Sequence, residues 1–228
     1  MDARRGLPSF VSAHEEEDGR ENILIGWTPL IELKRIVAKE GINVRLIGKM
    51  EAYQPLASVK DHGALRMIED VEEKGLLTPG VSTLLAATGG NLGIGLAYIA
   101  IRKGYKFIAV MPTEYSLEIL LRYLGAKVSP TDSKLGFQGM NDRVNKLKES
   151  IPDVYEIDQV TNLANPEAHF RGTGPEIWKD TAGKVDIFVA AAGSGGTITG
   201  TARHLKMKNP NRVMLNKSRM TMLVVLVH

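Results

Sequence analysis

The stretch that decides the fold is STLLAATGGNLGIGLAYIAIRKGYKFIAVM, residues 82–111. Its apolar run 82–87 predicts a buried strand, which passes through Thr88-Gly-Gly-Asn-Leu-Gly into a helical pattern over 92–103. A second apolar run over 106–111 predicts another strand. Two strands joined by a crossover helix lie parallel in one sheet, so this unit indicates a parallel α/β fold.

The same alternation continues on both sides of that unit. Further strands are expected at 43–49, 126–129, 153–157 and 185–190, and further helices late in 22–40, from Lys60 to Gly75, and over 115–124, 137–149, 165–180 and 197–207. This rhythm predicts the α/β class, with parallel twisted sheets and helices on both faces. Ligands of such sheets bind beyond the carboxyl ends of the strands, so the loops that follow strands are the candidate sites.

Composition narrows the class of protein. The 228 residues are 43% hydrophobic and 24% charged, as in ordinary globular proteins, and no apolar run is long enough to predict a membrane span. The net charge of +3 comes from interleaved signs without a basic stripe, which argues against a nucleic-acid partner. The absence of cysteine excludes disulfides and thiolate metal sites, and the five histidines are too scattered to predict a metal site. The acidic run 15–18 argues against a targeting peptide, so residues 1–21 are expected to be a disordered N-terminus of a cytoplasmic protein.

One loop has the composition of a phosphate site. Gly193-Ser-Gly-Gly-Thr197 joins a predicted strand to a predicted helix. Its glycines let backbone N–H groups converge, and the helix N-terminus adds positive potential. No lysine precedes Thr197, so this is not a Walker loop, and the Rossmann spacing is also missing. The alternative is a plain glycine-rich turn.

The loop 88–93 has the same strand-to-helix setting. It offers backbone donors and the short polar side chains of Thr88 and Asn91, without a charge of its own. Such a loop could receive a carboxylate, or Asn91 could simply cap the following helix.

Lys60 begins a helical pattern, just after Ser58. The positive potential of a helix N-terminus disfavours an ammonium there, so this lysine is either turned into water or kept neutral. Neutral lysines form Schiff bases. A neutral lysine, a phosphate site and a carboxylate site are together what a pyridoxal-phosphate enzyme acting on an amino acid requires.

Many specific motifs occur along the chain. They are Ser58-Val59-Lys60-Asp61, Leu77-Thr78-Pro79-Gly80, Gly90-Asn91, Gly93-Ile94-Gly95-Leu96-Ala97, Met111-Pro112, Ser116-Leu117-Glu118, 165–169, 173–178, 184–188 and 193–197. Together they resemble the plant-type cysteine synthases, the O-acetylserine (thiol)-lyases among the fold type II pyridoxal-phosphate enzymes. The resemblance runs from about Ile25 to about Arg212.

The resemblance implies a role for each matching position. Lys60 would hold pyridoxal 5′-phosphate as a Schiff base and move the substrate's α-proton, and Asn91 would hydrogen-bond the ring oxygen. The cofactor phosphate would be bound by Gly193, Ser194, Gly195, Gly196 and Thr197. The substrate carboxylate would be bound by Thr88, Gly89, Asn91, Leu92 and Gln159.

The implied reaction is β-replacement, which makes L-cysteine from O-acetyl-L-serine and sulfide, or β-cyanoalanine if cyanide is the nucleophile. The resemblance further implies a homodimer, and serine acetyltransferase as a possible partner. It also implies two α/β domains. The smaller would cover 43–148, the larger 22–42 with 149–212 and incomplete, and 213–228 would be an aberrant tail.

The chain departs from the family pattern at the substrate loop. Gly89 and Leu92 replace a serine and a threonine, and a hydrogen bond to a charged group is worth about 1.5–3 kcal/mol, so each loss is expected to cost about 10- to 150-fold. Leu92 is also expected to intrude where the carboxylate belongs. His62 replaces an arginine beside Lys60, which removes a permanent charge, and Val160 replaces an aromatic wall of the pocket.

The end of the chain gives the alternative hypothesis. After about Arg212 the resemblance stops, as in a frame-shifted or mis-spliced product, so the alternative is a truncated member that binds cofactor or a family partner without turnover. The β-prone run 222–227 is expected either to replace the family's next strand or to remain an unpaired edge.

Overall fold

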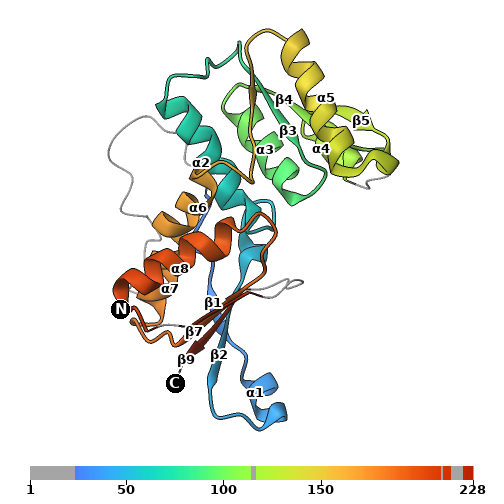
Figure 1. The fold of residues 1–228 in the computed structure, drawn as a ribbon. Helices are drawn as coiled ribbons and strands as arrows, with labels where there is room; N and C mark the ends of the chain where they lie inside the picture. The colour runs from blue at the N-terminus through green and yellow to red at the C-terminus, as the bar shows by residue number, and fades with distance from the viewer. Residues whose placement is uncertain (1–23, 114–116, 212, 217–222, 228) are drawn as a thin grey trace, which may run out of the picture.

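The computed structural model describes residues 24–113, 117–211, 213–216 and 223–227. Within them lie two sheets, one in each lobe of Figure 1. The first sheet has the order β5-β4-β3-β6 and is parallel throughout. Its strands are β3 (Thr83–Ala87), β4 (Lys106–Pro112), β5 (Lys127–Thr131) and β6 (Val154–Glu156).

Helices cover both faces of this sheet. On one face, Leu84 and Ala86 of β3 are buried in the same core as α2 (Lys60–Glu73) and α3 (Asn91–Arg102). On the other face, Leu85 packs in a core with Val144 of α5 (Gly136–Ser150). The short helix α4 (Glu118–Tyr123), which follows β4, adds Leu121 to the core of α2 and α3. A strand buried on both faces reads as a continuous apolar run, which is why 82–87 predicts β3 well.

The second sheet is mixed, with the order β1-β2-β9-β7-β8. Only β7 and β8 are parallel, and the other neighbours are antiparallel. Its strands are β1 (Leu30–Glu32), β2 (Arg45–Lys49), β7 (Ile187–Ala190), β8 (Val213–Asn216) and β9 (Leu223–Val227). The α/β class is therefore confirmed, and antiparallel pairing is a feature that the strand–helix rhythm did not predict.

Strand β9 lies inside the second sheet. Val225 is in register with Ile47 of β2 on one side and with Phe188 of β7 on the other. The prediction that 222–227 could remain an unpaired edge is therefore wrong. Because both backbone edges of β9 find partners, the predicted tail 213–228 contributes two paired strands within its described part.

Two strands lie in a different sheet from the one that the predicted domain limits imply. β2 falls within 43–148 but pairs with β1 and β9, and β6 falls within 149–212 but pairs with β3. The reason for β6 is that α5 packs on the first sheet and returns the chain to it as a parallel strand. The predicted N-terminal segment 1–21 lies outside the described residues.

The helices beside the second sheet are α6 (Ala164–Ala168), the π-helical turn η3 (His169–Thr173), α7 (Gly174–Asp180) and α8 (Gly196–Lys208). The single helix expected over 165–180 is thus interrupted by a π-turn, and the helix expected late in 22–40 shrinks to α1 (Lys34–Glu40). A Cβ at Gly200 would collide with the carbonyl oxygen of Pro166, so α8 packs directly on the α6 backbone. In the described part of the chain, no helix is both long and apolar enough to cross a bilayer.

Candidate active site

The site begins at the N-terminus of α2, where Lys60 is the first helical residue. The backbone N–H of Lys60 donates to Ser58 Oγ at 3.2 Å. One residue further on, Asp61 Oδ2 accepts the backbone N–H of Leu56 at 2.9 Å. These two bonds close the turn that leads into α2 and fix the position from which the Lys60 side chain starts.

Lys60 is half-buried, and burial lowers the pKa of its amine below the ordinary value. No carboxylate contributes to this shift, so nothing offsets the desolvation of the ammonium. Burial thus increases the fraction of the neutral amine, which is the form that attacks a carbonyl carbon.

The second part of the site is the N-terminus of α8. Gly195 takes a left-handed φ of 83°, which turns the chain from the loop into the helix. No side chain caps this end, and Thr199 is the first residue whose N–H reaches back to a carbonyl, that of Gly195. Among the described residues, the N–H groups of 196–198 therefore have no acceptor, which is the arrangement of an anion site at the end of a long helix.

The side chain of Asn165 joins these two parts. Its Nδ2 donates to the backbone oxygen of Gln159 at 2.8 Å and to Ser194 Oγ at 3.0 Å. Its Oδ1 lies against Gly63 of α2 and Gly196 of α8, and a Cβ at either glycine would collide with it. One buried amide thus ties together α2, the predicted substrate residue Gln159 and the phosphate loop.

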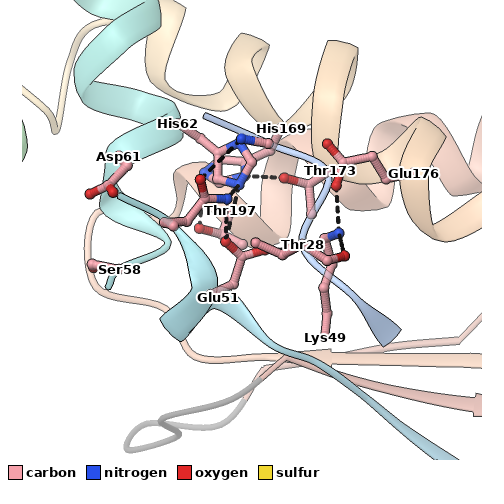
Figure 2. A network of polar contacts seen from close by, with 12 residues as sticks. Thr28, Lys49, Glu51, Ser58, Asp61, His62, His169, Thr173, Glu176 and Thr197 are labelled. Atoms are coloured by element: carbon pink, nitrogen blue, oxygen red, sulfur yellow. Dashed lines mark hydrogen bonds and ion pairs between the residues drawn. The ribbon is translucent and has the colours of Figure 1, made fainter. Parts of the chain in front are cut away.

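His169 supports the same loop from η3. Its Nδ1 lies 2.8 Å from Thr173 Oγ1 and its Nε2 lies 3.1 Å from Thr197 Oγ1, as Figure 2 shows. Complete burial lowers the pKa of His169 well below its ordinary value, with further contributions from the charges of His62 and Lys60. The imidazole is therefore neutral at physiological pH.

Neither Asn165 nor His169 was among the site residues predicted from the sequence. A signal for them exists, because Asn165, His169 and Thr173 recur every four residues within the predicted helix 165–180. Residues four apart share one helix face, so this spacing indicates a polar line on an otherwise apolar element.

The third part of the site is the N-terminus of α3. Gly90 is the N-cap residue, no side chain caps the helix, and Asn91 is the first helical residue and exposed. The alternative in which Asn91 merely caps α3 is therefore wrong, and its amide is available to a ligand. Thr88 is buried, and a Cβ at Gly93 would lie 3.0 Å from its Cγ2, so Thr88 packs under the helix.

Leu92 was predicted to intrude where a carboxylate binds, but its side chain lies elsewhere. Its side chain is 5% exposed and packs in the core between α3 and the first sheet. Part of it also lines a cavity of about 390 Å³, together with the half-buried Gln159 and the exposed Val160. Leu92 of the loop 88–93 and Gln159 thus line one cavity beside the first sheet.

His62 lies in a buried polar network. Its Nε2 is 3.0 Å from Glu51 Oε2 and 2.7 Å from Gln54 Nε2, and its ring centroid is 5.3 Å from that of His169. Burial acts to raise the pKa of Glu51, but hydrogen bonds from His62 and Gln54 and the charges of His62 and Lys49 hold it below its ordinary value. The residue that replaces the family's arginine therefore pairs with a buried carboxylate.

Asp61, the residue after Lys60, has an incompletely paired side chain. It is fully buried, and its Oδ1 has no hydrogen-bond partner among the described residues. Burial raises its pKa to about 6, although the Leu56 N–H bond acts in the opposite direction. A Cβ at Gly95 would lie 3.6 Å from Oδ1, so this oxygen faces α3.

A second buried lysine contrasts with Lys60. Lys49 is fully buried, but its Nζ donates to Glu176 Oε2 at 2.5 Å and to the backbone oxygen of Thr28 at 2.9 Å. Its charge is thus balanced by a carboxylate, and Figure 2 shows it in this pair. This arrangement suits a structural ion pair between β2 and α7.

These features fit pyridoxal phosphate. A phosphate dianion matches the uncapped α8 N-terminus, where the loop glycine Gly193 has open space around the position of a Cβ. An aldehyde matches the desolvated, unpaired amine of Lys60. A cofactor held at these two points would lie between α2 and α8, which Asn165 connects.

Comparison with known proteins points to the same group. A family profile described as "Pyridoxal-phosphate dependent enzyme" matches residues 22–222. The chain is 44% identical to cysteine synthase 3 of Caenorhabditis elegans over 82% of its length and 56% of that protein. It is 46% identical to cystathionine beta-synthase of Apis mellifera over 82% of its length and 38% of that protein.

A solved structure gives the same result for the fold. The crystal structure of O-ureido-L-serine synthase superposes with a TM-score of 0.78 at 37% identity, covering 84% of this chain and 60% of that one. The chain thus spans about half the length of the cysteine synthase that it matches. Since the family profile covers most of the chain, this protein belongs to the family of pyridoxal-phosphate dependent enzymes, together with the cysteine synthases and cystathionine beta-synthases.

Proposed function

We propose that the protein catalyses a pyridoxal-phosphate dependent β-replacement that makes L-cysteine from O-acetyl-L-serine and sulfide. The observation that carries this proposal is the position of Lys60. Its amine is desolvated at the tip of α2, and that helix is joined through Asn165 to the uncapped N-terminus of α8. By relation to the family, the proposal includes a homodimer and docking of serine acetyltransferase.

Each residue has a distinct part in the proposed reaction. When bound, the cofactor supplies an electron sink for the substrate's α-carbon. Lys60 Nζ would hold the cofactor covalently until the substrate's amino group displaces it, and the released neutral amine would then take the proton from the α-carbon. The residues of the phosphate loop, Gly193, Ser194, Gly195, Gly196 and Thr197, bind the phosphate, chiefly through backbone N–H groups at the start of α8.

The α3 end orients the amino acid. Backbone N–H groups at residues 91–93 meet the substrate carboxylate, since Ile94 is the first residue of α3 whose N–H reaches back to a carbonyl. The exposed amide of Asn91 would hydrogen-bond the cofactor ring. Gln159 lines a cavity beside Leu92, close to the carboxylate site.

A second candidate function is cofactor binding without turnover. It is favoured by the loop 88–93, because Gly89 supplies no hydroxyl and the Leu92 side chain packs in the core. Two donors that the family directs at the substrate are thus missing, while the phosphate loop and Lys60 remain in place.

An absorbance titration separates the two candidates. Purified protein is mixed with pyridoxal phosphate, and O-acetyl-L-serine and then sulfide are added. The proposal predicts a band near the visible edge that shifts with O-acetyl-L-serine and returns with sulfide as cysteine forms. Homocysteine and cyanide in place of sulfide determine the preferred nucleophile.

Lys60→Ala is the control for that titration. It is expected to lose the band and all turnover, an effect of at least about 1000-fold, because it removes both the covalent link and the proton carrier. A band without a shift would favour binding without turnover. No band, with Lys60→Ala identical to the unmodified chain, would overturn both candidates.

A further inference from the structure

The contacts of His169 determine which of its nitrogens carries the proton. Thr173 is fully buried, and its Oγ1 has a single hydrogen-bond partner among the described residues, His169 Nδ1 at 2.8 Å. If Nδ1 carried the proton, the Thr173 hydroxyl would be a buried donor without an acceptor, which is unfavourable. The hydroxyl of Thr173 therefore donates to Nδ1, and the ring proton lies on Nε2.

This tautomer decides the direction of the next hydrogen bond. Nε2–H donates to Thr197 Oγ1 at 3.1 Å, so Thr197 accepts through a lone pair and its own proton is left to donate elsewhere. In the opposite tautomer Thr197 would donate to the ring and turn a lone pair toward any anion at the helix end. A neutral histidine with a fixed tautomer thus determines whether Thr197 attracts or repels a phosphate.

We propose that His169 is a positioning residue of the phosphate loop, which, through Thr173 and Thr197, directs a hydroxyl proton at the phosphate group. The proposal rests on the assignment of residues 193–197 as the phosphate site. It gives the relay Thr173–His169–Thr197 a task that packing alone does not explain.

Two further observations place this relay firmly against the loop. η3 is a π-helical turn, a rare conformation that recurs at functional sites, and the relay's first two members are its first and last residues. α8 approaches η3 closely, since a Cβ at Gly200 would lie 2.8 Å from His169 Cβ. This close packing keeps Thr197 of α8 beside the His169 ring.

The matched variants His169→Gln and His169→Asn test the proposal. A glutamine amide nitrogen can occupy the place of Nε2 and still donate to Thr197, whereas asparagine ends near Nδ1 and cannot reach it. Affinities are measured for pyridoxal phosphate, for pyridoxal, which lacks the phosphate, and for inorganic phosphate through its protection against thermal unfolding.

His169→Asn is expected to lower the affinity for pyridoxal phosphate and for inorganic phosphate about tenfold, which corresponds to the loss of one charge-assisted hydrogen bond. The affinity for pyridoxal should change by less than about twofold. His169→Gln should recover most of that loss. His169→Asn should add nothing to Thr197→Val, because both remove the same bond. If His169→Asn folds poorly, Thr173→Val, which releases the tautomer at nearly constant volume, should still weaken phosphate and not pyridoxal.

The proposal is overturned if the variants weaken pyridoxal as much as pyridoxal phosphate, or if glutamine is no better than asparagine. It is also overturned if the losses of His169→Asn and Thr197→Val add. Failure of the proposed function looks different: inorganic phosphate then protects the unmodified chain and pyridoxal phosphate gives no visible band.

Discussion

The two loops that begin α8 and α3 are alike in sequence type and differ in their support. Each loop follows a strand that has a parallel neighbour, and each is rich in glycine. Neither helix has a side-chain cap. The loop before α8 is held by Asn165 at Ser194 and by His169 at Thr197. In the described residues, the side chains of 88–93 make no hydrogen bond.

The difference separates two kinds of binding. Buried, satisfied polar side chains fix the loop before α8 in advance, so little ordering remains when an anion arrives, and preorganisation of this kind raises affinity. In the loop before α3, the backbone donors have no partner in the first turn, and no hydrogen bond holds the side chains among the described residues. Its side chains would therefore become ordered only when a ligand binds. The proposed phosphate site is thus preorganised, whereas the proposed site for the amino-acid substrate is not.

Among changes to the two loops, the largest effect is expected where the weaker loop is repaired. Gly89→Ser restores one hydroxyl to the substrate loop and should raise kcat/KM for O-acetyl-L-serine about 10- to 150-fold, with no change in cofactor affinity. Gly89 does not have a positive φ, so a side chain there carries no backbone strain. Steady-state kinetics with a coupled cysteine assay provides the measurement.

Gly90→Ser is the matched control one residue later. A Cβ at Gly90 meets nothing within 4 Å, and serine at an N-cap accepts a first-turn N–H. It should stabilise α3 by a few tenths of a kcal/mol, about the usual Gly-to-Ser difference at a cap, and lower substrate affinity. A gain in kcat/KM from both serines alike would show that the loop's donors play no specific part.

Breaking the support of the stronger loop should cost stability. Gly196→Ala drives a Cβ into the Asn165 side chain, so the free energy of unfolding should fall by about 1–3 kcal/mol. In the same loop, a Cβ at Gly193 meets nothing within 4 Å. Gly193→Ala should therefore change the free energy of unfolding by no more than about 0.5 kcal/mol. Urea unfolding of the cofactor-free proteins measures both, and equal losses would contradict the support assigned to Asn165.

The side of Lys60 that faces α3 also has an unsatisfied polar group. It is Asp61, whose Oδ1 is buried without a hydrogen-bond partner among the described residues. Its folded pKa of about 6 lies above its unfolded value, so the folded state binds the extra proton and stability falls as pH rises through that range. Asp61→Asn removes this penalty and should be more stable than the unmodified chain by about 1–3 kcal/mol at pH 8. The difference should vanish near pH 4.

Unfolding free energies at pH 4, 6 and 8 check that prediction, with the exposed Glu149→Gln as control. His169 acts in the opposite sense, because its depressed pKa means that stability is lost as pH falls below its unfolded value. A difference between Asp61→Asn and the unmodified chain that stays constant with pH would contradict a titrating, buried carboxyl at this position.

Much of the first sheet was predictable from local pattern. The run 82–87 is apolar throughout because β3 is buried on both faces, and Lys60 begins α2 as its helical spacing indicates. The second sheet was not predictable in this way. Its strand β9 lies antiparallel between β2 and β7, which are about 180 and about 40 residues earlier in the sequence. No local periodicity records such long-range pairing.

The site divides in the same way. Its glycines and its lysine have special backbone or charge properties that show in a sequence, but the links between its parts do not. Asn165 and His169 act through contacts with Ser194 and Thr197, which only the packing of α6 and η3 against α8 creates. The predicted intrusion of Leu92 on a bound carboxylate was wrong, because the position of this residue in the loop sequence does not show that its side chain turns into the core.

The most direct test of the whole interpretation is to trap the covalent link. The protein is mixed with pyridoxal phosphate, reduced with borohydride, digested and mapped by mass spectrometry. A desolvated, unpaired Lys60 beside the phosphate loop predicts a single pyridoxyl adduct on Lys60, with none on Lys49, whose amine is held by Glu176. An adduct on Lys49, labelling spread over surface lysines, or no adduct at all would contradict it.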